Sequence, residues 1–294
     1  MNSIEVNQIT KDYGQGKGVF DISFTVNKGE VLGFLGPNGA GKTTTIRQLM
    51  GFIKPDKGTV SILGKDCFKD AKSIQNNVGY LPGEITFMDD ISGHDFIKFI
   101  ADLKGIKNMD KAHELIEYFE LNPSGKIKKM SKGMKQKIGL VCAFMQDPDI
   151  YIFDEPTSGL DPLMQNKFVD LVISEKEKGK TILMSSHIFE EVEKTCDRVA
   201  IIKDGHIVAI DKIDSLKQNK TKLFILTFES EQDVLAFSKE FPDAQIEKNN
   251  AQLKVKDIKS FIHSLQKYQI KDLDIKTQTL EELFLHFYGG DKNV

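Results

Sequence analysis

The chain has 294 residues, a length typical of two domains. Hydrophobic residues make up 40% and charged residues 28%, as in ordinary globular proteins, and the formal net charge of −3 gives no reason to expect a nucleic-acid partner. No apolar run is long enough to span a bilayer, and residues 1–6 lack the pattern of a secretory signal, so we expect an intracellular protein that does not itself cross a membrane.

The first predicted elements are strands. Residues 4–10 and 20–26 have the composition of two paired strands. The apolar run Val31–Leu35 follows and predicts a buried strand, and residues 44–50 predict the start of a helix. A glycine-rich loop therefore connects a strand to a helix.

That loop matches the phosphate-binding pattern G-x-x-x-x-G-K-[ST] with Gly36, Pro37, Asn38, Gly39, Ala40, Gly41, Lys42 and Thr43. Glycines allow backbone N–H groups to converge on phosphate oxygens, and the helix dipole adds positive potential at the same point. Lys42 supplies a cation for the β- and γ-phosphates, and the Thr43 hydroxyl is a ligand for Mg²⁺. The motif predicts a site for a nucleoside triphosphate.

The middle of the chain, residues 84–147, is predicted to be mostly helical. Apolar residues recur at helical spacing over residues 94–104, 112–119 and 134–145.

A second polar motif ends the next strand. The run Ile150–Asp154, with Glu155 after it, is an apolar strand that ends in two carboxylates. Parallel sheets place ligands at the carboxyl ends of their strands, so Asp154 is positioned to hold Mg²⁺ near Thr43. Glu155 is positioned to polarise an attacking water. Taken alone, the pair also fits a strand end that faces solvent.

Another strand, predicted over residues 180–185, ends at Ser185-Ser186-His187. With the loop, the carboxylates and residues 156–161 in this order, the chain resembles the nucleotide-binding subunits of ATP-binding cassette (ABC) transporters over residues 2–215. The resemblance implies that residues 36–44, which include Thr44, are the Walker A motif and that residues 150–155 are the Walker B strand.

The same resemblance implies roles for further residues. Glu155 matches the catalytic glutamate, and His187 matches the switch histidine that contacts the γ-phosphate. Residues 158–161 match the D-loop, which communicates across the ATPase dimer. Tyr13 matches the aromatic residue that stacks on adenine, although a tyrosine that packs on the surface of a turn is the alternative.

The signature motif departs from the family pattern. The family has Leu-Ser-Gly-Gly-Gln where this chain has Met130-Ser131-Lys132-Gly133-Met134. Ser131 and Gly133 are retained just before a predicted helix, so they still form an anion site, which in the family faces the γ-phosphate held by the other subunit. Lys132 either adds positive charge there or is solvated.

The Q-loop also departs from the pattern. Residues 78–82 match its approach, but Gly83 stands where the family has glutamine, and Glu84 follows. Glu84 either replaces the amide as a metal or water contact or is a loop charge without that role. Both departures resemble the branch of ABC exporters that includes bacitracin-type and other peptide-antibiotic resistance transporters.

After Ser215 the family motifs stop. Two helices, 232–241 and 258–268, alternate with strands at 224–228, 245–255 and 270–275, of which 245–255 is a pair turning at Asn249-Asn250. This β-α-β-β-α-β order predicts a small ferredoxin-like domain. A final helix is predicted from Thr279, with one apolar face that packs in the core of that domain or, alternatively, forms a dimer or regulatory surface.

The expected fold is therefore α/β, a P-loop NTPase with a RecA-like core, an antiparallel β subdomain and a helical subdomain (84–147) in residues 1–215, followed by a C-terminal α+β domain in residues 216–294. The resemblance implies an ATPase that uses ATP and Mg²⁺ and drives export through a separate membrane permease at the cytoplasmic face of the membrane. It also implies a second ATPase subunit and no nucleic acid. The alternative is a soluble ABC-type ATPase, or a nucleotide-dependent regulator, not engaged in transport.

Overall fold

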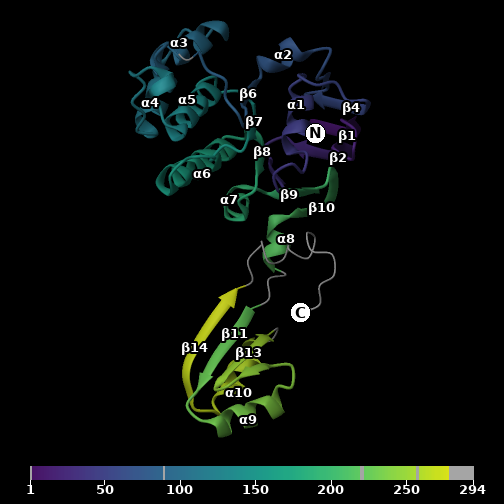
Figure 1. Cartoon of the computed structure of the whole chain (residues 1–294), viewed down its shortest axis with the longest axis vertical. Coiled ribbons are helices and arrows are strands. Elements are labelled where there is room, and N and C mark those ends of the chain that lie inside the picture. Colours follow the sequence, from purple (N-terminus) through teal and green to yellow (C-terminus); the bar gives the residue numbers. More distant parts are fainter. Residues whose placement is uncertain (1, 89, 219–221, 256–257, 278–294) are drawn as a thin grey trace. The chain divides into compact units, whose positions relative to one another are not determined.

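The computed structural model describes residues 2–88, 90–218, 222–255 and 258–277. The chain divides into two compact units, Met1–Ile213 and Asp214–Val294. The first unit is built around two sheets and the second around one, and most of their strands are labelled in Figure 1.

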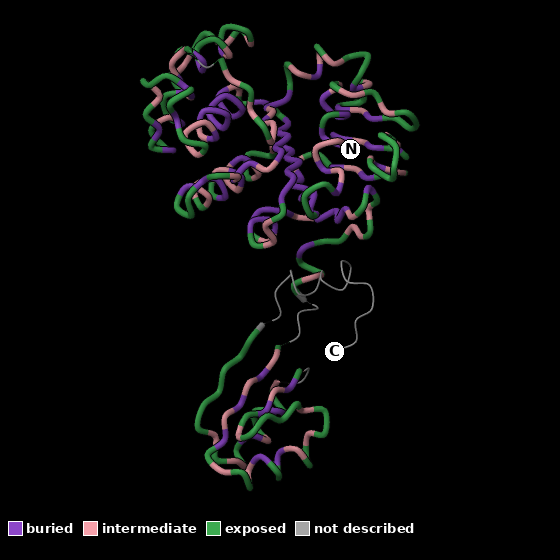
Figure 2. The backbone as a smooth tube through the Cα atoms, in the orientation of Figure 1, coloured by how far each residue is buried: buried purple, intermediate pink, exposed green. Residues whose placement is uncertain are grey.

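The first unit is built on a six-stranded sheet with the order β10-β9-β3-β8-β7-β6. All neighbours are parallel except β10, which is antiparallel to β9. Strands β3, β7 and β8 are buried at every residue, as Figure 2 shows, which is expected where both faces of a parallel sheet are covered. The strands are β3 (Val31–Leu35), β6 (Val78–Leu81), β7 (Ile150–Asp154), β8 (Thr181–Ser186), β9 (Arg198–Lys203) and β10 (His206–Lys212).

A four-stranded antiparallel sheet, with the order β2-β1-β4-β5, forms a second layer. The predicted pairing of the first two strands is confirmed. Helix α1 (Lys42–Leu49) contacts strands of both sheets, and its Ile46 and Leu49 are buried in the apolar cluster that joins them. The remaining elements here are β1 (Asn2–Asp12), β2 (Gly18–Asn27), β4 (Lys57–Ile62), β5 (Lys65–Asp66) and α2 (Ala71–Gln75).

The predicted helical region contains α3 (Gly93–Leu103), α4 (Asp110–Tyr118), the 3₁₀ helix η1 (Ile127–Lys129) and α5 (Lys132–Phe144). Helix α5 contacts α3, α4 and strand β6. It begins two residues before the predicted start because the Ser131 hydroxyl accepts a hydrogen bond from the Met134 N–H at 3.2 Å, which makes Ser131 the N-cap.

Two helices follow the last buried strands. Helix α6 (Pro162–Glu177) is capped by Asp161, whose carboxylate accepts a hydrogen bond from the Met164 N–H at 3.0 Å. Helix α7 (Phe189–Thr195) packs on β3, β8 and α6. Helix α8 (Ile213–Gln218) begins at the last residue of the first unit.

The second unit is a four-stranded antiparallel sheet with the order β12-β13-β11-β14. Apolar side chains of the sheet and of its two helices form one core, centred on Phe224, Phe228, Phe237 and Phe261. The predicted β-α-β-β-α-β order is confirmed by β11 (Lys222–Phe228), α9 (Glu231–Glu240), β12 (Gln245–Glu247), β13 (Asn250–Val255), α10 (Ile258–Leu265) and β14 (Ile270–Thr277).

The predicted position of one turn in this unit was wrong. The hairpin turns at Lys248-Asn249, not at Asn249-Asn250, because Asn250 already pairs with Glu247 in the sheet. Lys248 has a φ of 54°, in the left-handed region that such a turn requires. The helix predicted from Thr279 lies outside the described residues.

Candidate active site

The glycine-rich loop connects the carboxyl end of β3 to the first turn of α1. Two of its glycines are required by the geometry. Gly41 has a φ of 111°, and a Cβ there would lie 2.5 Å from Val19 Cγ1. A Cβ at Gly36 would lie 2.4 Å from the Ile202 carbonyl oxygen. The loop therefore packs closely on β2 and β9, which holds its backbone at the end of the sheet.

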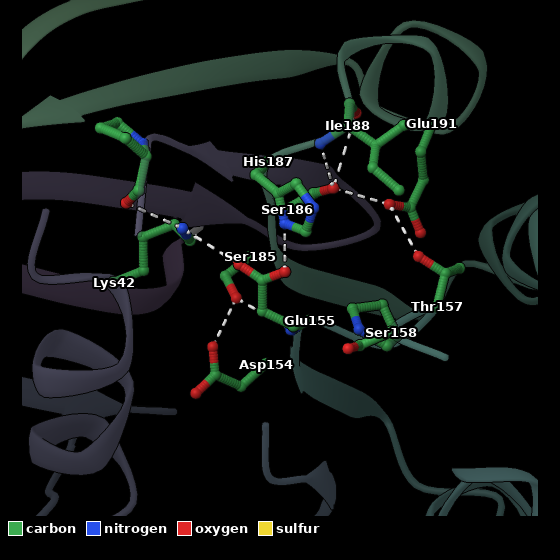
Figure 3. A network of polar contacts seen from close by, with 12 residues as sticks. Lys42, Asp154, Glu155, Thr157, Ser158, Ser185, Ser186, His187, Ile188 and Glu191 are labelled. Carbon is green, nitrogen blue, oxygen red and sulfur yellow. Dashed lines mark hydrogen bonds and ion pairs between the residues drawn. The ribbon is translucent and has the colours of Figure 1, made fainter. Parts of the chain in front are cut away.

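Lys42 is the central cation of the loop. Its side chain is 5% exposed, and the ammonium group donates hydrogen bonds to the carbonyl oxygens of Gly36 at 2.6 Å and Pro37 at 3.2 Å. Lys42 Nζ also lies 3.0 Å from Glu155 Oε1. The loop thus presents a buried positive charge next to the carboxylate that follows strand β7 (Figure 3).

Asp154 ends strand β7 and is fully buried. Its Oδ1 accepts a hydrogen bond from Ser185 Oγ at 2.5 Å, whereas Oδ2 is buried without a hydrogen-bond partner. A Cβ at Gly83 would lie 3.1 Å from Oδ2, so the unpaired oxygen faces Gly83. A buried carboxylate oxygen without a donor is costly unless something positive pairs with it, which makes Asp154 fit a divalent cation.

Glu155 follows with a φ of 52°, a left-handed conformation that is uncommon outside glycine. Its N–H donates to Ser185 Oγ at 3.0 Å, which anchors the backbone of Glu155 to β8. Glu155 Oε2 lies 2.5 Å from His187 Nδ1, so Lys42, Glu155 and His187 form a continuous polar chain (Figure 3). The backbone strain at Glu155 is of the kind that persists at functional sites.

These groups line a cavity of about 1020 Å³, large enough for a nucleoside triphosphate. Its basic side chains outnumber the acidic ones: Lys17, Lys42, Arg47, Lys132 and Lys135 face Glu84, Glu155 and Asp204. An excess of positive charge suits a polyanionic ligand. The predicted site residues that line it are Tyr13, Pro37, Asn38, Gly39, Gly41, Lys42, Thr43, Thr44, Glu84, Glu155 and His187.

Tyr13 lies at the rim of this cavity. Its side chain is 54% exposed, and its N–H donates to the Lys17 carbonyl at 2.9 Å, which closes the turn between β1 and β2. The ring is therefore accessible to a planar ligand such as a nucleobase.

Other predicted site residues lie outside the lining of the cavity. Gly36, Ala40 and Asp154 are buried and are not among the lining residues. Ser131 and Gly133 lie at the start of α5, where a Cβ on Gly133 would come 2.8 Å from the Gly159 carbonyl oxygen. The structure therefore does not bring Ser131 and Gly133 into the cavity of their own chain.

Within the described ranges, no three His, Cys, Asp or Glu side chains gather into a metal-binding cluster. Mg²⁺ is commonly held by one or two protein oxygens together with substrate phosphates. Asp154 and Thr43 are the protein groups that match this arrangement. Glu84 lines the cavity next to Gly83.

Two polar residues at the site were missed by the sequence analysis. Gln136 of α5 is buried and donates from Nε2 to the Pro156 carbonyl at 2.8 Å and to the Glu155 carbonyl at 3.4 Å. Glu191 of α7 is buried beside Ser186. The only sequence signal for Gln136 was its place in a largely apolar helix, and Glu191 looked like an ordinary acidic residue in the first turn of a helix.

Comparison with known proteins agrees with this geometry. The ABC transporter family model matches residues 19–158. The uncharacterized ABC transporter ATP-binding protein YhcH of Bacillus subtilis (strain 168) is 32% identical over 98% of this chain and 97% of its own length. The bacitracin transport ATP-binding protein BcrA of Bacillus licheniformis is 37% identical over 74% of this chain and 72% of its own length.

A solved structure of the ATP-binding subunit of an ABC transporter superposes with a TM-score of 0.66 and is 31% identical, covering 73% of this chain and 92% of the other. The predicted fold class is confirmed by such cassette structures. The sequence, the fold and the cavity lined by the Walker A loop and Glu155 show that this chain belongs to the ABC transporter family, as one of its ATP-binding, ATP-hydrolysing subunits.

Proposed function

We propose that the Lys42–Glu155–His187 chain is the hydrolytic centre of this ATPase. The observation that carries the proposal is the placement of Glu155, whose two carboxylate oxygens contact Lys42 and His187 at the edge of the cavity. Lys42 binds the β- and γ-phosphates, and Glu155 accepts the proton of the attacking water. His187, whose side chain is 50% exposed, contacts the γ-phosphate.

The remaining site residues bind and orient the nucleotide. The loop backbone from Gly36 to Thr44 cradles the phosphates, and the Tyr13 ring stacks on adenine. Asp154 Oδ2 and the Thr43 hydroxyl would hold Mg²⁺, and Glu84 would contribute either directly or through water. When bound, Mg²⁺ neutralises charge on the phosphate oxygens during transfer.

A second subunit completes the site. Ser131 caps α5, so the first N–H groups of a 13-residue helix and the serine hydroxyl form an anion site, and Ser131 is not among the residues that line the cavity of its own chain. We propose that this end of α5, with Ser131 and Gly133, contacts the γ-phosphate held by a second ATPase subunit. The signature variant of this chain keeps both residues.

The transport partner is a separate membrane permease, which holds this subunit at the cytoplasmic face of the membrane. None of the helices in the described ranges combines the length and hydropathy needed to cross a membrane. Met88 is 47% exposed at the end of the segment that starts at Gly83, and this segment is where we expect the permease to bind. The relation to BcrA supports a peptide or another amphipathic compound as the exported substrate.

The domain organisation of the chain is part of the same proposal. Residues 1–215 form the ATPase domain with its helical subdomain at 84–147, and residues 216–294 form an accessory α+β domain. The alternative function, a soluble ATPase or nucleotide-dependent regulator, uses the same ATP site without a membrane partner.

Purification of the tagged full chain from detergent-solubilised native membranes tests the proposal. We expect to recover a multi-spanning membrane protein, to lose it with Met88→Asp and to keep it with Leu235→Asp, a matched change of an exposed apolar residue in the second unit. Recovery of no membrane protein, together with a strict monomer in ATP, would favour the regulator.

A further inference from the structure

Two loops meet at the proposed hydrolytic centre, and each carries one of its groups. The loop after β7 carries Glu155, and the loop after β8 carries His187. Glu155 is anchored by Lys42 and by the hydroxyl of Ser185. The His187 side chain is 50% exposed, so packing alone does not fix its ring. A further contact must therefore hold the His187 loop against the Glu155 loop if the 2.5 Å contact between Glu155 and His187 is to persist.

Glu191 connects these two loops. Its Oε2 accepts a hydrogen bond from Ser186 Oγ at 2.7 Å and another from Thr157 Oγ1 at 3.3 Å. Ser186 Oγ in turn accepts a hydrogen bond from the Ile188 N–H at 2.9 Å. One carboxylate on α7 therefore bonds to the residue before His187 and to the residue two positions after Glu155 (Figure 3).

The cost of this arrangement argues for a function. Glu191, Ser186 and Thr157 are all buried, and Glu191 Oε1 has no hydrogen-bond partner. The pKa of Glu191 is raised to about 7, mainly by burial and to a smaller extent by the nearby Glu155, although the bonds from Ser186 and Thr157 lower it. An apolar side chain in this position would avoid both the desolvation of a carboxylate and the unpaired oxygen. Residues retained at such a cost to stability are expected at functional sites.

We propose that Glu191 is a positioning residue that holds the His187 loop in register with Glu155. The inference rests on the proposed roles of Glu155 and His187. Glu191 acts through Ser186 and Thr157 and does not touch the nucleotide cavity, since it is absent from the cavity lining. A misplacement of about 1 Å in a catalytic group is enough to lower a rate by about 10²-fold.

Turnover of the purified full chain, compared between Glu191→Ala and Glu191→Gln, tests whether Glu191 positions the His187 loop. Because the glutamine oxygen still accepts both hydroxyl bonds, Glu191→Gln should stay within about threefold of wild-type kcat, whereas Glu191→Ala should lose at least about tenfold with KM for ATP changed less than about twofold. Glu190→Ala, which changes the exposed neighbour paired with Lys194, is the matched control and should leave kcat unchanged.

A double-mutant cycle separates positioning from a merely structural role. In the His187→Ala background, Glu191→Ala should lower kcat by less than about a further twofold, because the group that it positions is gone. An equal loss with and without His187, or a wild-type kcat in Glu191→Ala, would overturn the proposal. If Glu191→Ala unfolds, Thr157→Val replaces it in the cycle. This change removes the hydrogen bond between Thr157 and Glu191 without leaving a cavity.

The imidazole resonances of His187 in nuclear magnetic resonance spectra at one fixed pH give a readout that is independent of hydrolysis. They should shift in Glu191→Ala and stay in place in Glu190→Ala. If the wild-type chain shows no turnover, the proposed hydrolytic centre fails, and the resonances still decide whether Glu191 positions His187. Unshifted His187 resonances in Glu191→Ala would contradict the proposal that Glu191 positions His187.

Discussion

Lys42 Nζ lies 3.0 Å from Glu155 Oε1, so the cation of the phosphate loop and the carboxylate that follows β7 form an ion pair at the edge of the nucleotide cavity. The ammonium group also holds two carbonyl oxygens of its own loop. One side chain therefore links the loop that binds the phosphates to the carboxylate proposed to activate water.

Lys42→Ala should abolish or greatly weaken ATP binding, because it removes the cation that pairs with the β- and γ-phosphates. The fold should be kept, since the apolar cluster around α1 does not include this side chain. Equilibrium binding of a fluorescent ATP analogue, with circular dichroism as the control for folding, checks this. Wild-type affinity in the variant would contradict the assignment of the phosphate loop.

ATP should promote dimerisation, because each γ-phosphate brings negative charge that the N-terminus of α5 in the other subunit neutralises. Ser131→Arg should block the closed dimer by its bulk and spare ATP binding to the monomer. Light scattering with Mg-ATP in the Glu155→Gln background measures both. Ser124→Arg, at another exposed serine, is the control and should still dimerise. If Ser124→Arg also stays monomeric at every protein concentration, the proposal that two subunits share the ATP site is contradicted.

Gly83→Ala should raise the Mg²⁺ concentration required for ATP hydrolysis. The added Cβ would lie 3.1 Å from Asp154 Oδ2, closer than ordinary van der Waals contact, and it would crowd the oxygen proposed to hold the metal. Crowding that costs about 1.4 kcal/mol corresponds to about a tenfold weaker apparent affinity. Gly125→Ala, where a Cβ has open space, should leave the Mg²⁺ dependence unchanged. An identical Mg²⁺ dependence in both variants would remove Gly83 from the metal site.

Glu191 should make stability depend on pH. Burial raises its pKa from 4.5 to about 7, so between these values the folded state keeps a proton that the unfolded chain has lost. Stability from this residue is therefore present below pH 4.5 and is lost as the pH rises through 7, by about 3 kcal/mol in total. Denaturant unfolding should show that the free energy of unfolding of Glu191→Gln, relative to wild type, rises by about this amount between pH 5 and pH 8. A difference independent of pH would contradict the buried ionisation.

Much of the core could be predicted from sequence. Val31–Leu35 was predicted at both ends, because a strand buried on both faces is a short apolar run with polar neighbours. The order of elements in the second unit followed from the same reasoning. Element ends were less accurate where a side-chain cap decides them, as at Ser131, which starts α5 at Lys132.

The site could be predicted only where a motif is local in sequence. Asp154 ends β7, Glu155 follows it, and Lys42 begins the helix after the loop that follows β3, so their positions come from parallel-sheet geometry. Glu191 is different, because an acidic pair in the first turn of a helix indicates solvent exposure until packing on β3 and β8 buries one of the two. Gln136 likewise meets carbonyl groups about 20 residues away, a contact that no local pattern encodes.

The central claim is that Glu155 performs the chemistry while Asp154 holds the metal, and ATP turnover measured beside ATP affinity in Glu155→Gln tests it most directly. The account predicts that Glu155→Gln binds Mg-ATP like wild type and loses turnover by about 10²–10⁴-fold, the usual contribution of a positioned general base. Asp154→Asn, its matched neighbour, should instead weaken Mg²⁺-dependent binding. Near-wild-type turnover in Glu155→Gln would contradict the account and move the chemistry to another group, with His187 the next candidate.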